Sequence, residues 1–90
     1  MPLEKHEEEV LKRMYIHKLI GYRYQSIEKV SKIINWGEIA REFDVKKSLK
    51  GVLRKLKSKG YIDDHGKSMR VASLTRLGVA YAEQLIEEEF

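Results

Sequence analysis

The sequence has no cysteine and only one proline among its 90 residues. Without cysteine, disulfide bonds, thiolate metal sites and cysteine nucleophiles are all excluded. The apolar runs are only a few residues long, which is too short for a membrane-spanning helix. The first ten residues are highly charged and lack the apolar stretch of a signal peptide. We therefore expect a cytoplasmic protein that makes no membrane contact.

Positive charge is concentrated in the middle of the chain. Residues 41–70 carry ten Lys and Arg against four Asp and Glu, whereas residues 71–90 carry one against four. Residues 1–40 are close to balance, with seven against six. A basic central segment is typical of a phosphate-binding surface. Charge runs also occur on solvated helix faces that bind nothing, so composition alone leaves both interpretations open.

The spacing of apolar residues predicts a long helix at each end of the chain. The first covers about 3–20 and is expected to stop at Gly21; the last covers about 75–89 and begins at Thr75, a favourable cap. Since the apolar stripe of the first helix is wider than one packing face requires, we expect the two helices to form a homodimer interface. The residues expected to remain partly exposed for this contact are Leu3, Ile16, Tyr81, Leu85 and Phe90.

Between the first helix and residue 36 the pattern is less decisive. Residues 21–25 are expected to form a loop, and Ser26 can cap a short helix that runs to Ile34. Because this segment is rich in β-branched residues, a short strand at 32–34 is the alternative.

Residues 36–59 predict two short helices joined by a tight turn, which is a helix-turn-helix pattern. The first helix covers 36–43, and Asn35 followed by Glu38 resembles a capping box at its start. The second covers about 47–59, and Gly60 ends it. Four apolar residues of the second helix share one face and are expected to be buried: Leu49, Val52, Leu53 and Leu56.

A β-hairpin is predicted directly after this pair of helices, over about 61–74. Its strands are expected at 61–64 and 69–74, and residues 63–68, which include Asp, Gly and Ser, supply the turn. Gly78 lies one turn into the last helix, where a side chain would collide with a neighbouring element. The complete pattern predicts a mainly helical α+β fold with a small β-hairpin, as one domain over 1–90.

Three passages in this order resemble the winged helix-turn-helix superfamily of small archaeal and bacterial transcription regulators. Residues 37–43, GEIAREF, resemble the family's "E-I-A" helix. Residues 52–62, VLRKLKSKGYI, resemble the passage from its recognition helix into a strand, and residues 74–78, LTRLG, resemble the step from the wing into the last helix. The resemblance implies a DNA-binding transcription regulator that acts at the nucleoid without a cofactor.

Under this resemblance the 47–59 helix reads the major groove of double-stranded DNA, and the 61–74 wing lies on flanking DNA. Lysines near the end of the helix are expected to meet phosphates, which position a protein without reading sequence. Asp63 and Asp64, at the base of the wing, would repel phosphates unless they turn away. The predicted DNA-binding residues are Lys46, Lys47, Ser48, Lys50, Gly51, Arg54, Lys55, His65, Lys67, Ser68 and Arg70.

The sequence gives less support to other functions than to DNA binding. The alternative function is a winged-helix subunit of a ribosomal or replication assembly that binds RNA or protein. Tyr22-Arg23-Tyr24 alternates aromatic and basic side chains, which can stack on unpaired bases, but we favour a structural role in which the tyrosines wedge the loop against the first helix. We expect no enzyme and no metal site, because the sequence has no nucleophile motif and its three histidines are scattered.

Overall fold

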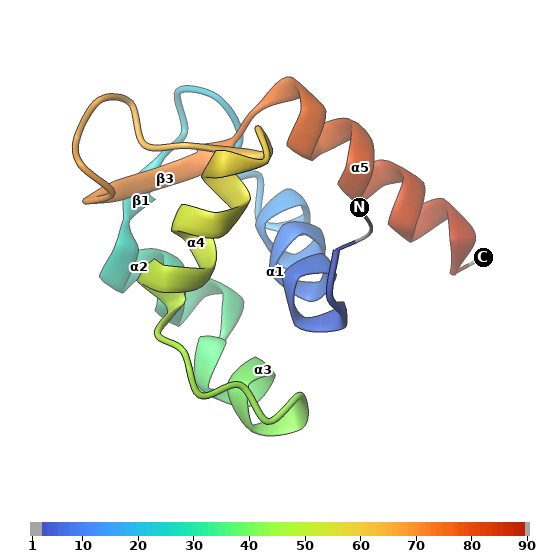
Figure 1. Ribbon diagram of the computed structural model, residues 1–90. Helices are drawn as coiled ribbons and strands as arrows, with labels where there is room; N and C mark the ends of the chain where they lie inside the picture. Colours follow the sequence, from blue (N-terminus) through green and yellow to red (C-terminus); the bar gives the residue numbers. More distant parts are fainter. Residues whose placement is uncertain (1–2, 90) are drawn as a thin grey trace.

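The computed structural model describes residues 3–89, and these form five helices and a small antiparallel sheet (Figure 1). The predicted α+β class is confirmed at this level. Across the described range, no helix is both long and apolar enough to cross a membrane. In chain order the elements are α1 (Lys5–Ile16), β1 (Gln25–Ser26), α2 (Ile27–Ile34), α3 (Trp36–Glu42), α4 (Leu49–Ser58), β2 (Ile62–Asp63), β3 (Val71–Leu74) and α5 (Arg76–Glu88).

The sheet has the order β1–β3–β2, with β3 in the centre. Ser26 lies opposite Val71 on one side of β3, and Ile62 lies opposite Leu74 on the other. Strand β1 was not expected, because residues 21–25 were predicted to form a loop throughout. The alternative strand at 32–34 is wrong, since α2 continues to Ile34 as the Ser26-capped helix predicts.

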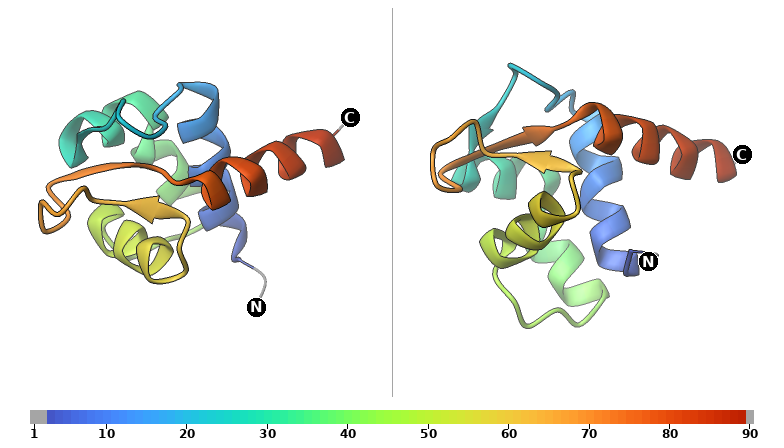
Figure 2. Two further views of the ribbon diagram at one scale, coloured as in Figure 1. Left: turned by 90° about the horizontal axis from the view of Figure 1, so that it is seen from above. Right: turned by 45° about the horizontal axis from the view of Figure 1, so that its top comes forward.

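The hydrophobic core lies between the inner face of the sheet and the helices that cover it. All four apolar residues predicted on the inner face of α4 are at most 4% exposed, which confirms the predicted orientation of that helix. Helix α1 runs through the centre and is covered by α5 along its outer side (Figure 2). Both views of Figure 2 show α5 extending away from the turn of the β2–β3 hairpin, so these two features occupy opposite ends of the molecule.

Helix α1 ends four residues earlier than predicted. Its last residue is Ile16, and Lys18 adopts a left-handed conformation with φ of 59°. The backbone N–H of Leu19 donates to the carbonyl of Met14 at 2.9 Å, the long-range bond of a Schellman cap. The apolar residues that follow were assigned to the helix by their spacing, but Leu19 is buried and Ile20 bridges to β3.

The capping box predicted at the start of α3 does not form. Asn35 makes no side-chain capping bond to α3; it has φ of 55°, and only its carbonyl accepts from the N–H of Glu38, at 3.1 Å. A capping box forms instead at α1, where the Glu7 carboxylate accepts from the Glu4 backbone N–H at 2.9 Å. Sequence reasoning failed here because the Glu38 carboxylate has a distant partner, the guanidinium of Arg13 at 2.7 Å.

Of the four described residues that were expected to remain partly exposed, three do so and only Leu3 is buried. Leu3 is buried at 7% exposure, and Tyr81 and Leu85 are half-buried. The Tyr81 hydroxyl donates to Glu8 at 3.3 Å, which ties α5 to α1. Ile16 remains 60% exposed, and Phe90 lies outside the described residues.

The connection from α4 through the hairpin into α5 follows the prediction, with shorter strands. Gly60 ends α4 with φ of 89°. The Thr75 hydroxyl accepts from the Gly78 N–H at 3.1 Å and donates to the Gly60 carbonyl at 2.6 Å, so one side chain links the ends of two helices. A Cβ on Gly78 would overlap the carbonyl oxygen of Tyr61, which is the collision that the sequence predicts.

Candidate nucleic-acid interface

Helix α4 begins at Leu49, two residues later than predicted, and Ser48 is its cap. The Ser48 hydroxyl accepts from the backbone N–H of Gly51 at 3.2 Å. Two residues predicted to face DNA are therefore bonded to each other within the first turn. The hydroxyl hydrogen of Ser48 remains free to donate to a ligand.

Three cations occupy the exposed side of α4 near its N-terminus. Lys47 precedes the helix, Lys50 lies in its first turn, and Arg54 follows one turn later. All three are exposed, and none takes part in an ion pair with another residue of the 3–89 range. We call Lys47, Lys50 and Arg54 the N-terminal cations.

The lysines toward the other end of α4 are occupied within the protein. Lys55 lies 3.6 Å from Glu4 and 3.9 Å from Glu7, measured from its ammonium nitrogen to the carboxylate oxygens. Lys57 lies 2.8 Å from Asp64, and Lys59 lies 3.8 Å from Glu7. We call Lys55, Lys57 and Lys59 the C-terminal cations. The sequence assigned all of them to phosphate contact.

Two of these lysines, Lys55 and Lys59, lie beside the carboxylate of Glu7. Its side chain is fully buried; one carboxylate oxygen accepts from the Glu4 backbone, and the other has no hydrogen-bond partner. A buried carboxylate requires compensating positive charge, and Lys55 and Lys59 supply it. His6 lies near Glu4 and Glu7, in a spacing that a metal ion can use. The two lysine ammonium groups already balance those carboxylates, so the cluster fits an internal ion-pair network.

Asp64 organises the turn of the β2–β3 hairpin. Its carboxylate accepts from the backbone N–H groups of Gly66 and Met69, each at 3.1 Å, and from the ammonium group of Lys57. The hydrogen bond from Lys57, with smaller contributions from the two backbone donors, holds the pKa of Asp64 below its usual value. Asp64 therefore points inward, whereas Asp63 stays exposed and accepts from the His65 backbone N–H at 3.1 Å, so the sequence requirement is met for Asp64 alone.

The hairpin turn holds an unusual backbone conformation. His65, Ser68 and Met69 all have φ between 53° and 61°, a region that costs free energy for residues other than glycine. The bonds to Asp64 oppose this cost and fix the turn. Lys67, Ser68 and Arg70 are exposed on it and make no ion pair with the rest of the described chain.

His65 is the predicted hairpin residue that turns inward. Its Nε2 lies 2.8 Å from the Ser73 hydroxyl, and its ring lies 4.2 Å from the ring of Tyr24, centroid to centroid. The expected wedge of Tyr22 and Tyr24 against α1 is wrong for this reason: Tyr24 packs on the hairpin, and Tyr22 is 94% exposed.

Helix α2 adds residues that sequence reasoning missed. Ser31 and Lys32 line a groove beside the N-terminus of α4, together with Trp36. The signal in the sequence was the apolar pair Val30 and Ile34, four residues apart. Because both are buried on one face of α2, Lys32 between them faces outward. What the sequence could not show was that α2 packs beside α4 and places this outer face next to Lys50.

Figure 1 shows α4 and the hairpin turn together on one side of the molecule, with α5 on the other. Comparisons with protein-family models, with curated proteins and with solved structures gave no match.

Proposed function

We propose that the chain is a winged helix-turn-helix protein that binds double-stranded DNA and regulates transcription in the cytoplasm. The order of elements supports this proposal: a turn joins α3 to α4, and a two-stranded hairpin follows α4 directly. In that architecture α4 enters the major groove, and the hairpin lies on flanking DNA.

The observation that carries the proposal is the unpaired state of the N-terminal cations. Every C-terminal cation of the same helix has a carboxylate partner within 4 Å, whereas the N-terminal cations have none among residues 3–89. Acidic residues are plentiful in this chain, so the lack of partners marks a surface kept available for an external anion. Base edges and phosphates are the anionic or acceptor groups that Lys and Arg recognise in duplex DNA.

The hairpin extends the same surface. Lys67 and Arg70 contribute two further exposed cations, and Ser68 contributes a hydroxyl donor. Asp64 is buried and bound to Lys57, so it does not oppose a phosphate there, whereas Asp63 remains exposed beside His65. Lys55 and His65 are assigned internal roles in this proposal, and Lys46 is assigned to its ion pair with Asp44 at 3.1 Å.

The proposal is tested by titrating the protein with duplex DNA, single-stranded DNA and structured RNA at matched salt. We expect duplex DNA to bind most tightly, with an affinity that falls by about 0.9 log units per phosphate contact for each tenfold rise in salt. The combined Lys47→Ala, Lys50→Ala and Arg54→Ala substitution should remove binding at moderate salt and leave the thermal unfolding transition in place. A triple variant that binds duplex DNA as tightly as the parent would overturn the assignment.

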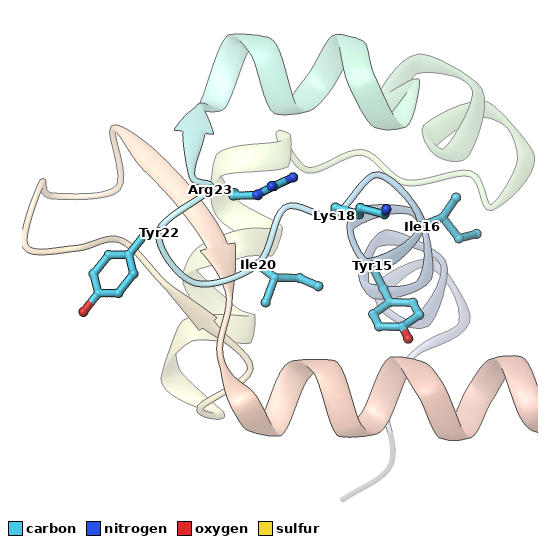
Figure 3. Close-up of a pocket in the computed structure, with 6 residues that line it drawn as sticks. All are labelled: Tyr15, Ile16, Lys18, Ile20, Tyr22 and Arg23. Atoms are coloured by element: carbon cyan, nitrogen blue, oxygen red, sulfur yellow. The ribbon is translucent and has the colours of Figure 1, made fainter.

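A subunit of a ribosomal or replication assembly that binds RNA is the second candidate, and one observation favours it. Tyr22 projects into solvent, where its ring can stack on an unpaired base, and the exposed Arg23 next to it in the chain points the other way (Figure 3). Tighter binding of structured RNA than of duplex DNA, lost on Tyr22→Ala, would select this candidate.

We further propose that two copies associate through α1 and α5. An open groove of about 690 Å³ lies beside the end of α1, and the exposed Ile16 and the partly buried Ile20 contribute apolar surface to it (Figure 3). One face of α5 begins at Arg76 and ends at Glu87, three helical turns apart. An antiparallel pair of α5 helices would set Arg76 of each copy against Glu87 of the other.

Charge exchange tests this dimer. Arg76→Glu and Glu87→Arg should each lower the molar mass measured by light scattering toward that of a monomer, because each places like charges opposite one another. The double variant restores opposite charges and should restore the dimer. A parent protein that is monomeric at every concentration, or a double variant no better than either single one, would contradict the proposed pairing.

A further inference from the structure

A groove of about 610 Å³ lies between α2 and the N-terminus of α4. Its apolar lining comes from Ile27, Trp36 and Leu49, one residue from each of the three helices that meet there. Trp36 is partly buried against the core, so part of its indole remains at the groove. It is the only tryptophan in the sequence.

The polar lining of the groove is suited to a phosphate chain. Lys32 on α2 and Lys50 on α4 are both exposed, and neither has an ion-pair partner within the part of the chain that the structure describes. Ser31 and Ser48 add two hydroxyl groups. Lysine and serine side chains are common donors to the phosphate oxygens of nucleic acids.

We propose that this groove holds the sugar-phosphate backbone of one strand of a DNA duplex, so that α2 forms a second wall of the DNA-binding surface. The proposal rests on the function proposed for α4. Lys50 belongs both to the groove and to the exposed side of α4, so a strand lying in the groove continues directly onto the N-terminal cations. The apolar floor contacts the deoxyribose, and the lysines and serines contact phosphates.

Glu28 allows a test in which a substitution is expected to strengthen DNA binding rather than weaken it. It is the one acidic residue in the groove lining, and it lies in the first turn of α2. A carboxylate there repels a phosphate backbone, whereas it would not repel an apolar or cationic occupant. Removing its charge should therefore strengthen DNA binding.

Helix α2 also supplies a matched control. Lys29 is exposed on the same helix, three residues from Lys32, but it is not part of the groove lining. Lys32→Gln and Lys29→Gln make the same change in charge. The experiment measures duplex binding by each variant and by Glu28→Gln over a range of salt concentrations, using the anisotropy of a labelled duplex. Trp36 fluorescence, quenched by neutral acrylamide, is followed in the parent protein alone, with the duplex and with polyglutamate.

Lys32→Gln should reduce the slope of log affinity against log salt by about 0.9, the value of one lost phosphate contact. Lys29→Gln should leave the slope unchanged, and Glu28→Gln should raise the affinity. Bound duplex should shield Trp36 from acrylamide. Because the quenching uses the parent protein, it does not depend on the folding of any variant.

Two results would overturn the assignment of the groove to the DNA backbone and leave the function proposed for α4 intact. One is a duplex that binds through the N-terminal cations while Lys32→Gln and Lys29→Gln behave alike and Trp36 quenching is unchanged. The other is shielding of Trp36 by polyglutamate but not by the duplex, which would assign the groove to an acidic protein partner. Absence of any duplex binding by the parent would overturn the groove together with the proposed function.

Discussion

Both ends of α4 carry cationic side chains, but only those at the C-terminal end are paired with carboxylates of the described chain. At the N-terminal end, Lys47, Lys50 and Arg54 face solvent without partners in the described chain, whereas Lys55, Lys57 and Lys59 at the other end bind Glu4, Glu7 and Asp64. About half of the positive charge on this helix is therefore engaged within the protein. A count of lysines along a helix overestimates the charge that a ligand meets.

The difference follows from what packs against each end. The acidic start of α1 and the inward-turned Asp64 both lie against the C-terminal half of α4, where α5 also closes the structure through Thr75 and Gly78. On its exposed side, the N-terminal half of α4 borders the groove beside α2. One end anchors the helix, and the other remains available for binding.

The largest expected effect concerns the anchored end. Gly78→Ala places a Cβ against the carbonyl oxygen of Tyr61, which is backbone and cannot turn aside. The free energy of unfolding should fall by about 3 kcal/mol, because the cost of overpacking exceeds the gain of about 1 kcal/mol in helix propensity. Denaturant unfolding measures this.

Gly37→Ala, at a helical position with nothing within 4 Å of the added Cβ, is the control. It should raise the free energy of unfolding by up to about 1 kcal/mol. Equal effects of the two alanines would mean that α5 does not close the anchored end as described.

Lowering the pH should reduce the stability that Asp64 and Lys57 give to the C-terminal end of α4, and should have no such effect at the N-terminal end. Because the pKa of Asp64 is lowered in the folded protein, chiefly by Lys57, its contribution to stability is complete above its unfolded pKa of about 3.9. That contribution is lost as the pH falls through the folded pKa. Lys57→Met raises the folded pKa toward the unfolded value, so the contribution of Asp64 should be smaller and should be fully lost at a higher pH. Thermal unfolding between pH 7 and pH 2, with an NMR titration of the Asp64 carboxyl carbon, measures the shift.

The two backbone donors to Asp64 remain in this variant, so some lowering of its pKa should persist. Lys50→Met is the matched change at the free end and should leave the acid transition where it is. Coincident acid transitions for the parent and the Lys57 variant would show that this lysine does not serve as an anchor.

A smaller effect is expected at Thr75, whose hydroxyl links Gly60 and Gly78. Thr75→Val keeps the shape and removes both hydrogen bonds, so unfolding should become easier by about 1 kcal/mol. Thr75→Ser keeps the hydroxyl and should lose much less. If valine and serine are equivalent in urea unfolding, the link between α4 and α5 contributes little.

The sequence was sufficient where a residue type serves a local geometric need. The inward stripe of α4, the caps at Ser26 and Thr75, and the need for glycine at 60 and 78 were predicted and are confirmed. Each depends on helical spacing or on a backbone conformation that few residues can adopt.

It was insufficient where a residue depends on a distant partner. The pairing of Lys55 with Glu7 joins residues 48 positions apart in the chain, and nothing near either of them indicates it. Similarly, the end of α1 at Ile16 depends on Leu19 and Ile20 pairing with β3 at Leu74. Helical spacing alone continues past that point, which is why the predicted helix was too long.

Our central claim is that the N-terminal cations of α4 bind DNA and that its C-terminal cations are paired within the protein. It is tested most directly by two triple variants that remove the same charge. One replaces Lys47, Lys50 and Arg54 with alanine, and the other replaces Lys55, Lys57 and Lys59. Duplex binding is measured at low salt, where both remain bound, and at a temperature where both are folded. The first should reduce the slope of log affinity against log salt by about 2.7, the equivalent of three phosphate contacts, and the second should leave it unchanged while lowering the thermal stability. Equal reductions in the two variants would contradict this claim, because net charge alone would then explain the binding.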